Sequence, residues 1–209
     1  MLTFFYACYA MGDLYWLLYV AFEGTTPMVF WVSDLSWYTG FLFLCLLLRD
    51  VLERRKPEKT WWAYLAPAFS VAACLFFLQW GDYPGNLITA VLMGAMGYLT
   101  LLGLLNERER SPFRRLYLSF AFFFLNEYTM WFASCFWNGD TLWNPYFWFD
   151  GLLSVIAVWM ALSYRRRLAY LPARRHDILP VLRLHQYLLH RPFACRRRFR
   201  RFQHHSDGG

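Results

Sequence analysis

Four acidic residues lie inside the most apolar stretches of the chain: Asp13, Asp34, Glu127 and Asp150. A charged carboxylate at the centre of a membrane helix costs about 2.5–3.5 kcal/mol on insertion scales. No Lys, Arg or His occurs in these stretches to pair with the acids, because all five histidines lie in the C-terminal tail. The acids therefore predict carboxyl groups that are protonated, that line a wet cavity, or that hold a cation.

Aromatic side chains accompany the acids at helical spacing. Residues three or four positions apart on a helix project from the same face, and three of the acids are followed at this spacing by Trp or Tyr. The pattern predicts an outward-facing pocket that suits a small organic cation or amine, by charge and by cation–π attraction. The predicted ligand-binding residues are Asp13, Trp16, Asp34, Trp37, Tyr38, Glu127, Trp131 and Asp150.

Two other interpretations fit the same residues. Each acid can be a neutral carboxyl group that hydrogen-bonds to a Tyr hydroxyl, a Trp indole or a backbone carbonyl of a neighbouring helix, and its role is then structural. The acids can also form a proton path. Asp150 is the weakest member of the set, because its expected depth is close to that of the lipid headgroups.

Six apolar segments are long enough to cross a membrane, since a helical span needs about 17–25 residues. The chain is 58% hydrophobic, above the roughly 45–50% of soluble domains. The segments lack the two-residue alternation of barrel strands, so helices are favoured. We expect an all-α polytopic membrane protein with six transmembrane helices in three hairpins, plus a short amphipathic cytoplasmic helix. The predicted spans are residues 2–22, 28–48, 61–80, 86–105, 116–137 and 146–164.

Basic residues alternate from one connection to the next. The loops at 49–60 and 106–115 carry five and four Lys or Arg, whereas the turns at 23–27, 81–86 and 138–146 carry none. The positive-inside rule places the basic loops in the cytoplasm. We therefore expect a multi-pass protein of the plasma membrane with both termini in the cytoplasm.

An arginine-rich tail, residues 165–209, follows the transmembrane domain, residues 1–164. It holds 12 Arg and no Lys, and apolar residues at helical spacing predict an interfacial helix at about 178–190. We expect the tail to bind anionic lipids of the inner leaflet rather than nucleic acid, at about 1 kcal/mol per basic residue near the surface. The sequence does not identify a protein partner for it. The predicted lipid-binding residues are Arg165, Arg166, Arg167, Arg174, Arg175, Arg196, Arg197, Arg198, Arg200 and Arg201.

The sequence contains no common catalytic signature: no P-loop, no GxSxG, no HExxH and no dinucleotide glycine motif. Its five cysteines are widely spaced and predict packing residues, not a disulfide or metal framework. We expect no catalytic residue, metal or cofactor, and favour a non-enzymatic module that senses or binds a small ligand. A small cation- or proton-coupled transporter is the alternative, and an acid-dependent intramembrane lipid hydrolase is a second one.

The stretch GDLYWLLYVAFEGTTPMVFWVSDLSWYTGFLFLCLLLRD resembles the first hairpin of the multi-pass sensor regions that precede GGDEF, EAL and histidine-kinase domains in bacteria. The resemblance covers about 40 of the 209 residues. It implies a sensing role, in which a ligand or the state of the membrane moves the helices. No output domain is recognisable after the sixth segment, so the resemblance implies a stand-alone membrane module. The matching positions are Gly12, Asp13, Trp16, Tyr19, Gly24, Pro27, Asp34 and Tyr38.

Overall fold

The computed structural model describes residues 1–24, 32–53, 55, 57–109, 111–136 and 143–170, and these residues are helical almost throughout. No strand occurs among them, so the all-α prediction is confirmed for this part of the chain. The helices are α1 (Leu2–Glu23), α2 (Val32–Glu53), α3 (Leu65–Phe77), α4 (Tyr83–Asn106), α5 (Pro112–Phe136) and α6 (Pro145–Tyr170), with the 3₁₀ turns η1 (Trp61–Tyr64) and η2 (Leu78–Trp80) on either side of α3.

Four helical segments in the described residues are long and apolar enough to cross a membrane. They are Val32–Glu53, Trp61–Trp80, Tyr83–Asn106 and Pro145–Arg166. The helices α1 and α5 have sufficient length, 22 and 25 residues, but they are not among the segments whose mean hydropathy is that of a membrane span. Several tyrosines, Asp13 in α1, and Asn126 with Glu127 in α5 lower their mean hydropathy. Four apolar helices therefore support the prediction of a membrane protein. The number of six spans stays a prediction.

The chain divides into two compact units, Met1–Leu168 and Ala169–Gly209. The first unit contains almost all of the described residues. The predicted interfacial helix at 178–190 and the predicted lipid-binding residues from Arg174 to Arg201 lie outside the described residues. Of the remaining tail arginines, Arg165 and Arg166 are exposed near the end of α6.

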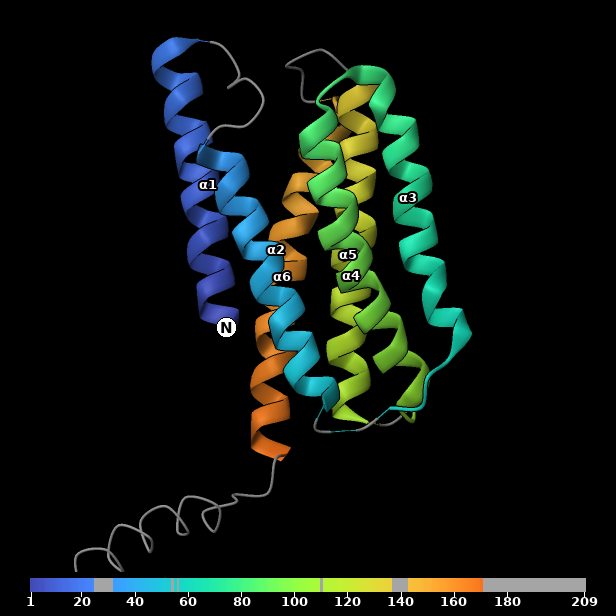
Figure 1. The fold of residues 1–209 in the computed structure, drawn as a ribbon. Coiled ribbons are helices and arrows are strands. Elements are labelled where there is room, and N and C mark those ends of the chain that lie inside the picture. Colours follow the sequence, from blue (N-terminus) through green and yellow to red (C-terminus); the bar gives the residue numbers. More distant parts are fainter. Residues whose placement is uncertain (25–31, 54, 56, 110, 137–142, 171–209) are drawn as a thin grey trace, which may run out of the picture. The chain divides into compact units, whose positions relative to one another are not determined.

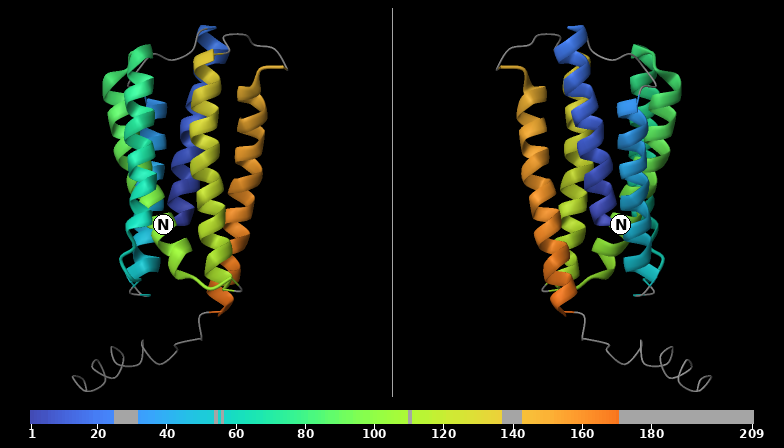
Figure 2. Two further views of the ribbon diagram at one scale, coloured as in Figure 1. Left: turned by 90° about the vertical axis from the view of Figure 1, so that its right-hand side faces the viewer. Right: turned by 90° about the vertical axis from the view of Figure 1, so that its left-hand side faces the viewer.

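Within the first unit, α4 packs against α2, α3 and α5, and α1 packs along α2 (Figures 1 and 2). Small residues of α4 permit this close approach. A Cβ atom at Gly97 would lie 2.7 Å from Cβ of Ala66 and 2.8 Å from Cε2 of Phe124, so α3, α4 and α5 meet where only a hydrogen atom fits. A Cβ atom at Gly103 would similarly overlap the ring of Tyr117.

The middle of the unit is filled by apolar side chains that are almost completely buried. They come from α2, α4 and α5, and each is at most 1% exposed. Large side chains at this exposure leave little room for water between the helices. The interior of this unit is therefore dry halfway along the helices, through Leu44, Leu48, Met93, Met96, Phe120 and Phe123.

The helical hairpins gather the connections at two opposite ends. The helices α2 and α4 finish at the end where α3 and α5 begin, which brings the described residues of both basic loops together (Figure 1). The turn between α3 and α4 lies at the other end, where Gly81 and Asp82 have φ angles of 89° and 45°. The carboxylate of Asp82 accepts a hydrogen bond of 3.0 Å from the backbone N–H of Gly85, which caps the first turn of α4.

Candidate functional site

A pocket of about 310 Å³ lies in the half of the first unit that is remote from the basic loops. Its wall takes residues from all six α-helices, from η2 and from the turn before α4. Seven of the eight residues predicted from the sequence line it: Asp13, Asp34, Trp37, Tyr38, Glu127, Trp131 and Asp150. Residues that are far apart in the sequence thus share one cavity.

The α1 side of the pocket is fixed by a contact between Asp13 and α2. The indole Nε1 of Trp37 donates a hydrogen bond of 2.9 Å to Oδ1 of Asp13. Gly12 makes room for it, because a Cβ atom there would lie 2.7 Å from the same indole nitrogen. The Gly-Asp pair of the sequence therefore works as a unit: the glycine admits the Trp ring and the aspartate receives its hydrogen bond.

The floor of the pocket holds Glu127, which is only 5% exposed. The hydroxyl group of Tyr9 donates a hydrogen bond of 2.5 Å to Oε1 of Glu127. The Tyr9 ring packs against the rings of Phe5, Phe41 and Phe123, with centroid distances of 5.3–6.3 Å. An acceptor carboxylate is therefore held in position by a rigid aromatic donor from another helix.

The α6 side contributes Tyr146 and Asp150. Nδ2 of Asn126 donates a hydrogen bond of 2.9 Å to the backbone carbonyl of Phe149, which links α5 to α6 next to this part of the wall. Asp13 lies within electrostatic range of Asp150, and Glu127 lies within range of both. These three acids come from three helices: Glu127 is buried, whereas Asp13 and Asp150 are exposed.

Near the turn between α3 and α4, the pocket is lined by Asp34 and Asp82. Asp34 lies in the first turn of α2, and Asp82 precedes α4. Partial burial raises the pKa of Asp82 above its ordinary value, and the nearby charge of Asp34 raises it further, while the hydrogen bond from Gly85 acts in the opposite direction.

Sequence reasoning did not select Asp82, Tyr9, Asn86 or Tyr146 as site residues, although all four line the pocket. Asp82 lies in a turn, where an aspartate usually caps a helix. Asn86 donates a hydrogen bond of 2.8 Å to the carbonyl of Gly81, and this bond closes the turn that carries Asp82. For Tyr9 the signal was its spacing of four from Asp13.

Two tryptophans differ from the predicted set of pocket residues. Trp16 is not among the residues that line the pocket. It follows Asp13 along α1, which extends past the first turn of α2 at this end (Figure 1). Trp80, which is not among the residues predicted from the sequence, does line the pocket, and its ring packs on Phe76 and Phe136.

Among the residues that the structure describes, the pocket lining contains five carboxylates and no Lys, Arg or His. Aromatic rings of Trp, Tyr and Phe make much of the remaining wall. Among the described residues, no group of three or more His, Cys, Asp or Glu is arranged to hold a metal ion. The arrangement can attract a cation by charge and by the negative faces of the rings.

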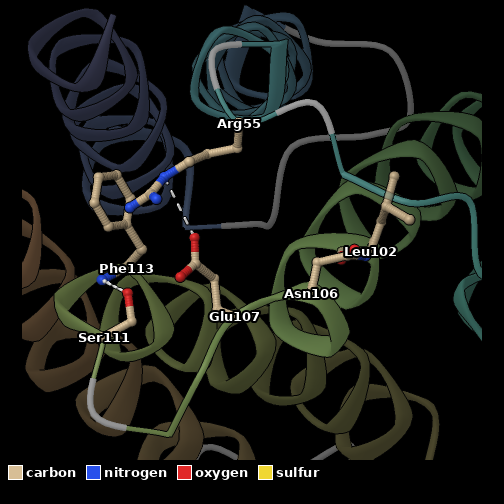
Figure 3. Close-up of polar contacts among 6 residues, drawn as sticks. All are labelled: Arg55, Leu102, Asn106, Glu107, Ser111 and Phe113. Atoms are coloured by element: carbon tan, nitrogen blue, oxygen red, sulfur yellow. Dashed lines mark hydrogen bonds and ion pairs between the residues drawn. The ribbon is translucent and has the colours of Figure 1, made fainter.

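A second cavity, of about 670 Å³, lies at the end that carries the basic loops. Nε of Arg55 is 3.5 Å from Oε1 of Glu107, and its guanidinium carbon lies 3.8 Å from the centroid of the Phe113 ring (Figure 3). Asn106 joins the α2–α3 connection to α4, since its side chain exchanges hydrogen bonds of 2.9 and 3.0 Å with the backbone of Glu58. These contacts fasten the connections together, and the charges that face this cavity are mixed.

The comparisons with known proteins give no relative for this chain: no family model matches it, and neither a curated protein nor a solved structure is significantly similar.

Proposed function

We propose that this protein is a membrane module that binds a small organic cation in the pocket between α1, α2, α5 and α6. The observation that carries the proposal is the composition of the lining in the described part of the chain: five carboxylates among aromatic rings, without a basic residue. Ionised carboxylates that converge without a counterion repel one another, and a bound cation relieves that repulsion.

The aromatic residues support an organic cation in preference to a bare inorganic one. Trp37, Tyr38, Trp131 and Tyr146 all face the cavity, and ring faces within about 6 Å of an ammonium group attract it by about 0.5–2 kcal/mol. The volume of about 310 Å³ is at the lower end of ordinary ligand pockets. A small amine or quaternary ammonium compound therefore fits both the charge and the size.

The dry middle of the first unit supports binding rather than passage. Below the pocket, Phe123, Met93 and Met96 are at most 1% exposed and fill the space between the helices. A ligand that enters the pocket therefore meets a closed floor in this conformation. We propose a sensing role, in which occupancy changes how α1 and α6 pack against the other helices.

The proposed membrane arrangement has six spans with the basic loops on the cytoplasmic side, so that the pocket faces outward. Support comes from the four apolar helices, and from the basic connections gathered at one end. Exposed aromatic residues occur near both ends, as in interfacial belts. Trp61 and Trp62 stack at 3.6 Å near the basic loops, and Trp143 and Trp148 are exposed near the other end.

Thermal unfolding of the detergent-purified protein tests the proposal. A ligand that binds the folded state at 100 times its Kd stabilises it by about 2.7 kcal/mol. We expect n-butylamine or tetramethylammonium to raise Tm, and n-butanol at the same concentration to leave it unchanged. The variants Asp13→Asn and Glu127→Gln should lose the rise.

The matched control is Glu23→Gln, which removes one carboxylate of α1 at an exposed position outside the pocket lining. It should keep the ligand-dependent rise in Tm. The proposal is overturned if no cation raises Tm at any concentration, or if the pocket variants respond to the cations as the wild type does.

A further inference from the structure

A groove of about 220 Å³ lies between α3, α4 and α5, and in the described part of the chain its lining shares no residue with the pocket. Of the described residues that line it, Thr100 alone carries a polar side chain. The wall residues Leu65, Phe69 and Leu125 are 48–55% exposed, so the groove is open to the surroundings of the helices. Because α3 and α4 belong to segments apolar enough to cross a membrane, those surroundings are the hydrocarbon chains of lipids.

The packing of α3 on α4 gives the level of Thr100 along the helices. Gly97 lies opposite Ala66, since a Cβ atom at Gly97 would lie 2.7 Å from Cβ of Ala66. The two helices form a hairpin and run antiparallel (Figure 1). Thr100, three residues further along α4, is therefore level with Ala63, which directly follows the two tryptophans that begin η1. The offset from these tryptophans is one or two residues, about 2–4 Å along a 3₁₀ turn.

The two tryptophans, Trp61 and Trp62, place this level at the boundary of the hydrocarbon core. They are exposed, and their rings stack at 3.6 Å. Exposed tryptophans of membrane helices are enriched at the depth of the lipid headgroups. The ester groups of a glycerophospholipid lie between its headgroup and its hydrocarbon chains, so Thr100 is at the depth of these esters.

The hydroxyl group of Thr100 is available to such a lipid. A threonine hydroxyl in a helix commonly donates to the carbonyl four residues earlier. Thr39 and Thr129 do so, with hydrogen bonds of 2.6 and 2.7 Å. The hydroxyl oxygen of Thr100 is buried and has no hydrogen-bond partner, and the residue is only 1% exposed. Since a buried hydroxyl group without a hydrogen bond is destabilising, a ligand that supplies an acceptor here is favoured.

From the level of Thr100 the groove continues toward the middle of the helices. Phe69 lies six residues after Ala63 in α3, which corresponds to about 9 Å. The ring of Phe69 packs on the ring of Phe124 from α5, with a centroid distance of 6.0 Å, and both rings line the groove. A hydrocarbon chain that starts at Thr100 therefore has an apolar wall beside it in this direction.

We propose that this groove binds one acyl chain of an ester-linked glycerophospholipid, whose ester carbonyl oxygen accepts a hydrogen bond from the Thr100 hydroxyl group. The chain runs toward Phe69, and the phosphate lies toward the basic loops. Lys59 is exposed just before η1, and its positive charge complements that phosphate. The proposal is independent of the cation pocket.

Native mass spectrometry of the full chain, released from detergent micelles, tests the proposal by measuring the affinity of the first bound lipid. The probes are dioleoylphosphatidylcholine and its diether analogue, which lacks both ester carbonyls. Both lipids are zwitterionic, so the arginine-rich tail favours neither. We expect the diester to bind at least about threefold more tightly, which is the usual net effect of one hydrogen bond.

Variants of Thr100 test the hydrogen bond itself. Thr100→Val keeps the shape of the side chain and removes the hydroxyl group, so it should bind both lipids equally. Thr100→Ser keeps the hydroxyl group and should keep the preference for the diester. The matched control is Thr129→Val, which removes an exposed hydroxyl group that already bonds within its own helix. It should behave as the wild type does.

A larger side chain at Ala121 tests the groove. Ala121 lines the groove from α5 and is half-buried. Ala121→Leu should occupy part of the space and weaken the binding of both lipids at least about threefold. The control is Ala72→Leu, at an exposed position of α3 outside the groove lining, which should leave both affinities unchanged. Size-exclusion chromatography and the Tm without added lipid establish that each variant is folded.

The proposal is wrong if the wild type binds the diester and the diether equally well, or if Thr100→Val keeps the preference for the diester. If Thr100→Val does not fold, Ala121→Leu decides. Lipid affinities unchanged by Ala121→Leu overturn the proposal, whereas a loss that Ala72→Leu does not share supports it.

Discussion

The hydroxyl group of Tyr9 in α1 and the carboxylate of Glu127 in α5 are joined by a hydrogen bond of 2.5 Å, although 118 positions separate them in the sequence. Trp37 and Asp13 join α2 to α1 in the same way. In lipid the hydrophobic effect does not hold helices together, so packing and interhelical hydrogen bonds take a larger share. These two hydrogen bonds therefore stabilise the helix packing that forms the wall of the pocket, and the bonded residues also line it.

The variant Tyr9→Phe should destabilise the folded protein by about 1–3 kcal/mol, because the buried carboxylate of Glu127 loses its donor. Glu127→Gln should have a smaller effect, since the amide oxygen still accepts the hydrogen bond. The measurement is the free energy of unfolding in mixed detergent.

The control for this pair is Tyr15→Phe in the same helix. Tyr15 is half-buried and packs on the ring of Tyr19, but it does not line the pocket. Its change should stay within about 0.5 kcal/mol. Equal losses in Tyr9→Phe and Tyr15→Phe would show that the Tyr9–Glu127 bond does not stabilise the fold.

Gly97 should not tolerate a methyl group, because a Cβ atom there would lie 2.7 Å from Ala66 and 2.8 Å from the Phe124 ring. We expect Gly97→Ala to lower the free energy of unfolding by about 1–3 kcal/mol, the usual range for overpacking. Alanine is the better helix former by about 1 kcal/mol, so a loss of stability can only come from the clash.

Gly94→Ala, one turn earlier on α4, provides the comparison. Its nearest neighbour would be Cβ of Ser70 at 3.4 Å, an ordinary contact. This variant should be neutral or slightly more stable than wild type. The predicted packing of α4 is wrong if the two alanine variants unfold at the same Tm.

The sequence predicted the helices well, because length and apolar composition report directly on burial in lipid. Asp13 and Glu127 could be singled out for the same reason: a carboxylate in an apolar helix has few explanations. These acids also lower the mean hydropathy of α1 and α5. For that reason the membrane crossing of these two helices is supported less strongly than that of the other four.

Asp82 was missed because its role depends on a turn, not on a periodic pattern. Its backbone has a positive φ of 45°, and Asn86 and Gly85 close the turn around it by hydrogen bonds. The sequence could not predict which acids lie close together, since the order of the helices along the chain does not give their arrangement in space. The pairing of Asp34 with Asp82 results from the packing of α2 on α4.

Asp82→Asn should stabilise the protein relative to wild type, and this gain should be larger at neutral pH than at acid pH. The folded-state pKa of Asp82 is raised above 3.8 by partial burial and by Asp34. At pH values between the pKa of the unfolded state and that of the folded state, Asp82 binds more protons in the folded protein than in the unfolded chain. The contribution of Asp82 to the free energy of unfolding of the wild type therefore falls as the pH rises. Asparagine does not ionise, still caps α4, and tolerates the positive φ.

The measurement is Tm of wild type and variant from pH 4 to pH 8. The difference, variant minus wild type, should increase with pH and then level off once Asp82 is ionised in both states. Glu109→Gln is the control for removing an exposed carboxylate at the opposite end. A difference for Asp82→Asn that does not change with pH would contradict the predicted direction.

Single cysteines should report that α1 and α5 cross the membrane when they are labelled in intact cells with a membrane-impermeant maleimide. The background replaces all five native cysteines with serine, and each probe is at an exposed position. Tyr83→Cys and Trp143→Cys should be labelled from outside, whereas Thr3→Cys and Glu109→Cys should react only after lysis. The physical reason is that the basic loops remain in the cytoplasm.

The four sites distinguish the crossing of α1 from the crossing of α5. If α5 does not cross the membrane, Glu109→Cys and Trp143→Cys are on the same side and react alike. If α1 does not cross, Thr3→Cys is labelled from outside together with Tyr83→Cys. Either result would remove one wall of the pocket from the membrane, since Tyr9 and Asp13 belong to α1 and Glu127 belongs to α5. The proposed outward-facing cation site requires that both helices cross.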